Sequence, residues 1–290
     1  MIIIGCSHGN HLASSIANRL KKPYSKLEVT HFPDSEIKLK FNKNIKNKTV
    51  VLVQSFYQNI NDNIIETLFA AETAKDLGAK KVILVAPYFP YLRQDKRFNK
   101  GECISLRTIA KNIDEDLDKI IIIDPHLHRE KTLKHIFKIS SKKLTANPLV
   151  EKYIKNNIKN PVIIGPDWES YKWAQKVAEG IGCDFAIMEK KRFSARKVKV
   201  TLNKKININS KNLVFIDDMI STGHTLLEAI KGMKKLGAKK VTCFAVHGIL
   251  VENALQKLKK AGATVITTNT IPNKAAKINV AELISNSLRK

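Results

Sequence analysis

The sequence predicts an α/β protein of two related domains, each with a mainly parallel sheet flanked by helices. Three observations support this: short β-branched runs alternate with amphipathic helical stretches, one six-residue motif occurs twice, and the chain has 290 residues. At about 150 residues per domain, that length suits two domains. Hydrophobic residues make up 43% of the chain and charged residues 27%, a composition that excludes a disordered or fibrous protein.

The predicted strands are continuous apolar runs, as expected for strands buried on both faces of a sheet. After a strand-like beginning at residues 1–4, these runs lie at residues 49–53, 81–85, 120–123, 162–164, 213–216, 241–246 and 264–266. Helical stretches alternate with them, and strand–helix–strand units of this kind build parallel sheets.

The repeated motif, Leu-Gly-Ala-Lys-Lys-Val, lies at residues 77–82 and again at residues 236–241. In both copies we expect a helix to end at the glycine, which tolerates the left-handed conformation, and a buried strand to follow. One strand–helix–strand unit used twice, about a domain apart, indicates duplication. We place the first domain at residues 1–144 and the second at 145–290, joined near 140–148, where the sequence is most loop-like.

The chain carries 51 Lys and Arg against 26 Asp and Glu, a formal net charge of +25, which indicates an anionic partner. The excess is spread along the chain, without a basic arm or zinc-finger spacing, so no nucleic acid is expected as partner. The four cysteines have no paired spacing, and no apolar run reaches the roughly 18 residues of a membrane span. We expect a cytoplasmic protein that has no membrane association.

The most informative segment, residues 214–225, is an apolar strand followed by two acids and a turn that begins a helix. The backbone N–H groups and hydroxyls of this turn are suited to hold a phosphate, and Asp217 and Asp218 are suited to bind sugar hydroxyls. An ordinary N-cap would explain the hydroxyls of the turn but not two adjacent acids after a buried strand. The phosphate-binding residues that we expect are Ser221, Thr222, Gly223, His224 and Thr225.

This segment resembles the phosphoribosyl pyrophosphate (PRPP) loop of type I phosphoribosyltransferases and of PRPP synthetases. Residues 31–36 resemble the nucleotide loop of the synthetases, Phe-Pro-Asp-Gly-Glu, and residues 87–96 match their Pro-Tyr-x-x-Tyr-x-Arg-Gln-Asp-Arg/Lys motif; the transferases have neither. Further matches follow in family order at residues 124–126, 165–167 and 189–192. The sequence is therefore identified as a member of the ribose-phosphate pyrophosphokinase (PRPP synthetase) family and resembles its archaeal branch.

The resemblance implies transfer of the β,γ-diphosphoryl group of ATP to the 1-hydroxyl of ribose 5-phosphate, which gives AMP and PRPP. It further implies Mg²⁺ as cofactor and a homo-oligomer built from dimers. The first domain would supply ATP and oligomer contacts, and the second the ribose 5-phosphate site and a flexible catalytic loop. By resemblance, the expected site residues are Asp34, Ser35, Glu36, Arg93, Gln94 and Asp95 for ATP; Arg192, Asp217, Asp218 and residues 221–225 for ribose 5-phosphate; Lys190 and Arg192 for catalysis; and His126 and Asp167 for the metal.

Several residues depart from the family pattern. Ser35 replaces a glycine of the nucleotide loop at a position that can require a positive φ, Ser221 replaces an aspartate, and His224 replaces a second glycine. Residues 167–170 lack the glycines that follow the aspartate in many members, and residues 55–59 of the first domain have lost the acids of the phosphate loop. We therefore expect the ligand chemistry to concentrate in the second domain.

Two alternatives remain open. A type I phosphoribosyltransferase would use PRPP with a base, but it would give no role to Arg93 and Gln94 or to the Lys190–Arg192 pair. A catalytically silent regulatory homologue would be expected to lose Lys190 or the Asp217–Asp218 pair, and both are present. The sequence offers no clear protein general base.

Overall fold

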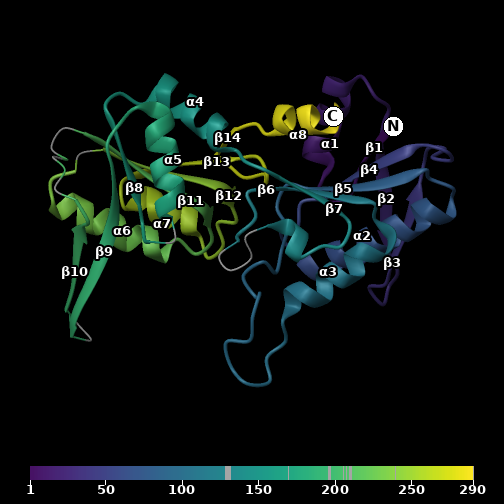
Figure 1. Cartoon of the computed structure of the whole chain (residues 1–290), viewed down its shortest axis with the longest axis horizontal. Coiled ribbons are helices and arrows are strands. Elements are labelled where there is room, and N and C mark those ends of the chain that lie inside the picture. Colours follow the sequence, from purple (N-terminus) through teal and green to yellow (C-terminus); the bar gives the residue numbers. More distant parts are fainter. Residues whose placement is uncertain are drawn as a thin grey trace. The chain divides into compact units, whose positions relative to one another are not determined.

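The structure, a computed structural model, consists of two compact units (Figure 1). Unit 1 comprises residues 1–144 and 280–290, and unit 2 comprises residues 145–279. The structure describes residues 1–127, 132–168, 170–194, 197–204, 206, 208, 211–238 and 240–289; of residues 190–194 and 197–200 it describes the backbone only.

Unit 1 is built on a 7-stranded sheet in the order β3-β2-β1-β4-β5-β6-β7. Neighbouring strands are parallel, except that β2 and β3 form an antiparallel hairpin. In chain order its elements are β1 (Ile2–Gly5), α1 (Asn10–Leu20), β2 (Tyr24–His31), β3 (Ile37–Phe41), β4 (Thr49–Val53), α2 (Ile60–Asp76), β5 (Lys81–Ala86), α3 (Ser105–Asp116), β6 (Lys119–Ile123), a short 3-10 helix (Leu133–His135), β7 (Ser140–Leu144) and α8 (Ala281–Arg289).

Unit 2 has a second 7-stranded sheet, in the order β10-β9-β8-β11-β12-β13-β14. Again the strands are parallel except for one hairpin, β9 with β10. In chain order its elements are α4 (Asn147–Asn157), β8 (Pro161–Gly165), α5 (Tyr171–Ile181), β9 (Phe185–Ser194), β10 (Lys197–Leu202), β11 (Asn212–Ile220), α6 (His224–Lys235), β12 (Lys240–Gly248), α7 (Ala254–Lys260), β13 (Ala263–Thr268) and β14 (Ala276–Ile278).

The two sheets match strand by strand, which confirms the predicted duplication. β1 corresponds to β8, β4 to β11 and β5 to β12, and each hairpin lies at the same end of its sheet. The repeated motif follows α2 and enters β5 in unit 1, and it follows α6 and enters β12 in unit 2. Gly78 (φ 79°) and Gly237 (φ 91°) adopt the left-handed conformation just after these two helices, as expected from the sequence.

Both faces of the second sheet are buried, as the continuous apolar runs predicted. Alternate residues of a strand point to opposite faces. Along β11, Phe215 packs in the cluster that contains Leu226 of α6, whereas Val214 packs in the cluster that contains Val177 of α5. The apolar stripe of α6 follows the 3.6-residue period and consists of Leu226, Ala229, Ile230 and Met233. β11, whose end carries the predicted acids, is therefore held from both sides.

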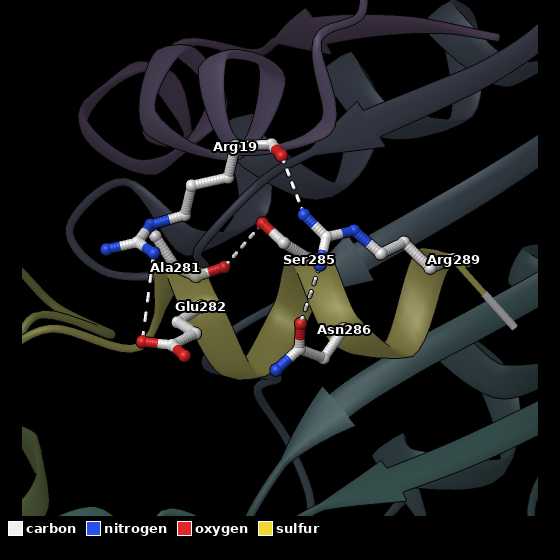
Figure 2. Close-up of polar contacts among 6 residues, drawn as sticks. All are labelled: Arg19, Ala281, Glu282, Ser285, Asn286 and Arg289. Carbon is white, nitrogen blue, oxygen red and sulfur yellow. Dashed lines mark hydrogen bonds and ion pairs between the residues drawn. The ribbon is translucent and has the colours of Figure 1, made fainter.

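The last helix, α8, packs against α1 of unit 1 (Figure 2). Arg289 donates from Nη2 to the backbone carbonyl of Arg19 at 2.8 Å, and Arg19 Nη1 lies 3.7 Å from Glu282 Oε2. The last carbonyls of a helix lack intrahelical donors, so Arg289 caps the end of α1. Ile284 of α8 is completely buried. The sequence division assigned residues 280–290 to the second domain, whereas in the structure they lie in unit 1 because α8 buries its apolar side there.

Several strands differ from the predicted ones. Residues 140–144, expected in the loop-like joint, form β7, a largely polar edge strand. β11 does not end before the acids but continues to Ile220, because its pairing with β12 extends to Gly248. The two hairpins, β2–β3 and β9–β10, were not predicted, since their strands are rich in charged residues. Within the described part of the chain, no helix is long and apolar enough to cross a membrane.

Candidate active site

In unit 2 the predicted ligand-binding residues lie along the carboxyl edge of the sheet. β8 and β11 pair in parallel, so the segment after Gly165 and the acids of β11 lie side by side. β9 is parallel to β8, which brings the end of β9 that carries Lys190 and Arg192 toward the same edge. Open α/β sheets bind their ligands outside the carboxyl ends of the strands. The topology therefore gathers the predicted residues where such a site is expected.

Three carboxylates, those of Asp167, Asp217 and Asp218, act on one another at this edge. Burial first of all, and then the negative charges of Asp218 and Asp167, raise the pKa of Asp217 well above its usual value. Asp217 Oδ1 accepts the backbone N–H of Asp218 at 2.9 Å, which orients the carboxylate. Like charges held this way favour the binding of a proton or a cation between them.

These carboxylates fit a hard divalent cation such as Mg²⁺, which prefers oxygen ligands. Among the described residues, no three His, Cys, Asp or Glu side chains converge on one metal position. Mg²⁺ commonly keeps several waters and is held by one or two carboxylates together with substrate phosphates. The predicted metal contact at Asp167 is consistent with this chemistry, and Asp217 and Asp218 are further candidates.

Asp167 also shapes the turn that leads into α5. Its Oδ1 accepts the N–H of Ser170 at 3.0 Å, and Ser170 Oγ donates to the carbonyl oxygen of Asp167 at 2.7 Å. Ser170 is buried. These bonds close the turn just before α5 begins at Tyr171.

The turn at residues 221–225 joins β11 to α6. Gly223 has a φ of 74°, a conformation that residues with a Cβ rarely adopt, and α6 begins at the next residue. The first N–H groups of a helix have no intrahelical acceptor and attract anions. The exposed imidazole of His224 lies 3.9 Å from Glu252 Oε2, so we expect any phosphate contact at His224 to come from its backbone N–H.

Lys190 and Arg192 belong to β9, where their backbones pair with Val200 and Val198 of β10. Their side chains, like residues 195–196 between the two strands, lie outside the described residues. The catalytic roles of Lys190 and Arg192 therefore stay predictions.

In unit 1 the turn between β2 and β3 contains Asp34, Ser35 and Glu36. β2 is parallel to β1, so this turn lies at the carboxyl edge of its sheet. Phe32 N–H donates to the carbonyl oxygen of Glu36 at 2.8 Å, and Ser35 N–H to that of Phe32 at 2.9 Å. Ser35 has a φ of 74°, the positive value for which the family pattern uses glycine. The strain expected at this substitution is therefore present.

We predict that Ser35→Gly raises the free energy of unfolding by about 0.5–1 kcal/mol. Relief of a left-handed conformation is worth about 1–2 kcal/mol, from which the extra entropy of glycine in the unfolded chain subtracts about 0.5–1 kcal/mol. Urea titration measures the change. Ser14→Gly, inside α1, is the matched control and should lower stability, since its conformation is helical. Destabilisation by Ser35→Gly would contradict the prediction.

Arg93, Gln94 and Asp95 lie between β5 and α3. Arg93 is exposed and Asp95 is half-buried. The amide nitrogen of Gln94 turns back on its own segment, 3.3 Å from the carbonyl oxygen of Cys103 and 3.4 Å from Glu102 Oε2. Gln94 thus supports the shape of the segment, and its contact with ATP stays a prediction, as do those of Arg93 and Asp95.

Glu102 is a residue of this segment that the sequence did not single out. Its carboxylate accepts the side-chain amide of Asn99 at 2.5 Å and the backbone N–H of Phe98 at 2.8 Å. These bonds, the one from Asn99 first, lower the pKa of Glu102. The only sign in the sequence was an acid that follows the basic stretch of residues 96–100 after one glycine. Glu102 fixes the loop that carries these cations.

His126 follows β6 in unit 1, two residues after Asp124, whereas Asp167 belongs to unit 2. Asp124 is buried, with a φ of 38°, and its N–H donates to the carbonyl oxygen of Leu144 at 2.9 Å. His126 is half-buried. The metal contact expected at His126 stays a prediction.

The strand of unit 1 that corresponds to β11 is β4. The residues that follow β4 are buried or held by hydrogen bonds within unit 1. Gln54 and Phe56 are completely buried, and Gln54 Oε1 accepts the N–H of His8 at 2.9 Å. Asn63 Nδ2 donates to the carbonyl oxygens of Tyr57 and Gln58 at 3.1 and 2.8 Å. No acid stands where β11 carries two, which supports the expectation that the ligand chemistry lies in unit 2.

A buried polar cluster at the ends of β12 and β13 was also not predicted from the sequence. Thr268 and Thr270 donate from Oγ1 to the carbonyl oxygen of Val246 at 2.8 and 2.9 Å, and His247 Nδ1 lies 3.0 Å from Thr270 Oγ1. These residues follow apolar strands, and nothing in their spacing distinguishes them from core positions. They fasten the carboxyl ends of β12 and β13 together.

The doubled fold, with an acid pair and a glycine turn into a helix at the carboxyl edge of its second sheet, is that of the phosphoribosyltransferase class. Residues 1–115 match the family model described as the N-terminal domain of ribose phosphate pyrophosphokinase, and residues 132–283 match the phosphoribosyl transferase domain. The chain belongs to the ribose-phosphate pyrophosphokinase family, a family of transferases, which confirms the resemblance described above.

Similar proteins support this assignment over the whole chain. The ribose-phosphate pyrophosphokinase of Methanothermobacter thermautotrophicus is 35% identical over 290 residues, 99% of this chain and 100% of the relative. That of Saccharolobus solfataricus is 37% identical over 274 residues, 93% of each chain. The crystal structure of phosphoribosylpyrophosphate synthetase from Mycobacterium smegmatis superposes with a TM-score of 0.87 and 26% identity, covering 99% of this chain and 97% of that one.

Proposed function

We propose that this protein transfers the β,γ-diphosphoryl group of ATP to the 1-hydroxyl of ribose 5-phosphate, giving AMP and PRPP. The observation that carries the proposal is the joint placement of the Asp217–Asp218 pair and the α6 turn at one sheet edge. The acid pair is suited to bind the sugar hydroxyls, and the turn, which begins only three residues after Asp218, is suited to bind the phosphate. Membership of the ribose-phosphate pyrophosphokinase family supports the same activity.

In this proposal the turn at residues 221–225 holds the 5-phosphate, and Asp217 accepts hydrogen bonds from the ribose hydroxyls. The 1-oxygen then forms a bond to the β-phosphorus of ATP, and the bond from that phosphorus to the α,β-bridging oxygen breaks. AMP leaves with the bridging oxygen, and the hydroxyl proton passes to solvent. Lys190 and Arg192 neutralise the charge of the transferring group, because positioning and electrostatics dominate phosphoryl transfer.

Bound Mg²⁺ would supply charge neutralisation along the polyphosphate. We assign a metal contact to Asp167 in unit 2, with Asp217 and Asp218 close by, and a metal contact to His126 in unit 1. In unit 1 the turn at residues 34–36 and the segment at residues 93–95 contact ATP.

The direct test is incubation with ATP, Mg²⁺ and ribose 5-phosphate, followed by chromatography of the nucleotides and of PRPP. We expect AMP and PRPP in equal amounts, and AMP only when ribose 5-phosphate is present. ADP in place of AMP would indicate transfer of a single phosphoryl group and would overturn the proposal. Conversion of PRPP and a base to a nucleotide, without AMP formation from ATP, would instead support a type I phosphoribosyltransferase.

Glu102→Ala is expected to raise KM for ATP several-fold with little change in kcat. Removing the acceptor frees the N–H of Phe98 and the amide of Asn99, so the loop of cations is no longer fixed before ATP binds. Glu102 stays ionised at neutral pH because its pKa is lowered, so the effect is fully present there. Steady-state kinetics check it, with Glu72→Ala on the exposed face of α2 as control. An unchanged KM would exclude this positioning role.

We further propose a cytoplasmic homo-oligomer built from dimers. Ile65 and Phe69 lie one turn apart on α2, with exposed fractions of 42% and 45%. Apolar side chains at this spacing on one helix face are suited to a subunit contact.

A further inference from the structure

Trp168 is the residue of the candidate site to which the proposed function gives no role. It directly follows Asp167. Its side chain is 58% exposed, more than that of any other large hydrophobic residue in the described part of the chain. A bulky, exposed aromatic side chain directly beside a carboxylate of the candidate site therefore requires an explanation.

The indole ring of Trp168 is supported from behind by other aromatic side chains. It stacks on the ring of Tyr171, with centroids 5.8 Å apart and an interplanar angle of 22°. Tyr171 in turn meets the ring of Phe185 edge-on, at 5.8 Å and 70°. The ammonium group of Lys204 lies 4.0 Å from the Phe185 centroid. One face of Trp168 is thus covered, and a flat aromatic surface, which we call the Trp168 platform, remains exposed.

The backbone under the platform is tightly held. The hydrogen bonds between Asp167 and Ser170 close the turn on both sides of Trp168. Gly165 packs so closely that an added Cβ would lie 2.6 Å from Ser170 Oγ. A rigid aromatic face loses little conformational entropy when a ligand binds to it.

We propose that the Trp168 platform stacks the base of an adenine nucleotide whose phosphates reach the neighbouring carboxylates through a divalent cation. Flat π faces bind nucleobases by stacking, and a carboxylate edge holds a nucleotide's polyphosphate through Mg²⁺. In this proposal Trp168 contacts the base of the nucleotide, and the adjacent Asp167 contacts its phosphates through the cation. This base contact is additional to the ATP contacts expected in unit 1. Its phosphate half rests on the proposed function, whereas its base half rests on the platform.

The chain has two tryptophans, so Trp173→Phe leaves Trp168 as the only one. With Mg²⁺ present, ADP is the probe, because it has no β,γ-diphosphoryl group to transfer. We expect ADP to quench the emission of Trp168 saturably, and pyrophosphate and ribose 5-phosphate, which lack a base, not to quench it. By calorimetry, Trp168→Ala should weaken one class of ADP sites about 5- to 150-fold, and Trp168→Phe should weaken it less. Leu236→Ala, at another exposed large hydrophobic residue of unit 2, should leave ADP binding unchanged.

Absence of saturable quenching by ADP, or equal quenching by pyrophosphate, would overturn the proposal. So would unchanged ADP binding by Trp168→Ala together with a smaller oligomer in light scattering, since Trp168 would then be a contact between copies. The assay for AMP and PRPP on the same preparations separates the two proposals. Activity without quenching rejects the platform alone, and quenching without PRPP formation rejects the proposed function alone.

Discussion

Lys190→Ala is expected to lower kcat for AMP and PRPP formation about 100- to 1,000-fold while ATP still binds with nearly its original affinity. The magnitude is that of removing one preorganised group from a developing negative charge, about 3–4 kcal/mol. Lys190 lies on β9, which runs parallel to β8 toward the edge where the acids of unit 2 gather. Its charge is needed mainly in the transition state, so kcat falls more than binding does.

Lys191→Ala is the matched control, because it removes the same charge one residue further along β9. We expect its turnover to stay near that of the original protein, since neighbouring residues of a strand face opposite sides of a sheet. Single-turnover kinetics and ATP titration separate chemistry from binding. Near-normal turnover of Lys190→Ala would refute the assigned role. Equal losses in both variants would show that only the positive charge of this strand matters, and not the position of Lys190.

Asp217→Asn is expected to abolish most activity and at the same time to stabilise the metal-free protein. Hydrogen bonds to a charged group contribute about 1.5–3 kcal/mol each, so losing two ribose contacts lowers kcat/KM about 100-fold or more. Stability rises because the neutral amide avoids the cost of burying a charged carboxylate and removes the repulsion from Asp218 and Asp167. Loss of activity accompanied by a higher Tm distinguishes a functional residue from a structural one.

The pH dependence has a definite sign. The pKa of Asp217 is higher in the folded protein than the roughly 3.9 of the unfolded chain. The folded state therefore binds the proton more tightly, and the stability of the metal-free protein falls as the pH rises from about 4 through the folded pKa. Asp217→Asn should flatten this slope, whereas Asp76→Asn, on the exposed end of α2, should keep it. A lower Tm for Asp217→Asn at neutral pH would contradict the prediction.

Most of the sheet framework could be predicted from the sequence because the central strands are buried on both faces. The runs predicted at 49–53 and 81–85 correspond to β4 (Thr49–Val53) and β5 (Lys81–Ala86) almost residue for residue. The edge strands could not be predicted in this way. β3 and β7 alternate or mix lysines with other residues, so only their pairing with a neighbouring strand identifies them.

The candidate site was predicted where motifs are local and missed where contacts come from distant residues. Positions such as Asp217 and Gly223 follow from a strand, an acid pair and a helix start within one short segment. The interaction of Asp167 with Asp217 depends instead on the parallel pairing of β8 and β11, which one sequence does not specify. Likewise, the hold of Glu102 on Gln94 and Phe98 depends on how a loop folds back on itself.

The return of α8 to unit 1 makes unit 2 an insertion between residues 144 and 280 rather than a second link in a simple tandem. Both chain termini therefore belong to the same folded body, and unit 2 is tethered at its beginning and at its end. A backbone cut in one tether still leaves the units covalently joined through the other. Ile284 and Arg289 attach α8 to unit 1. When α8 packs against α1, it therefore closes a large chain loop that contains all of unit 2.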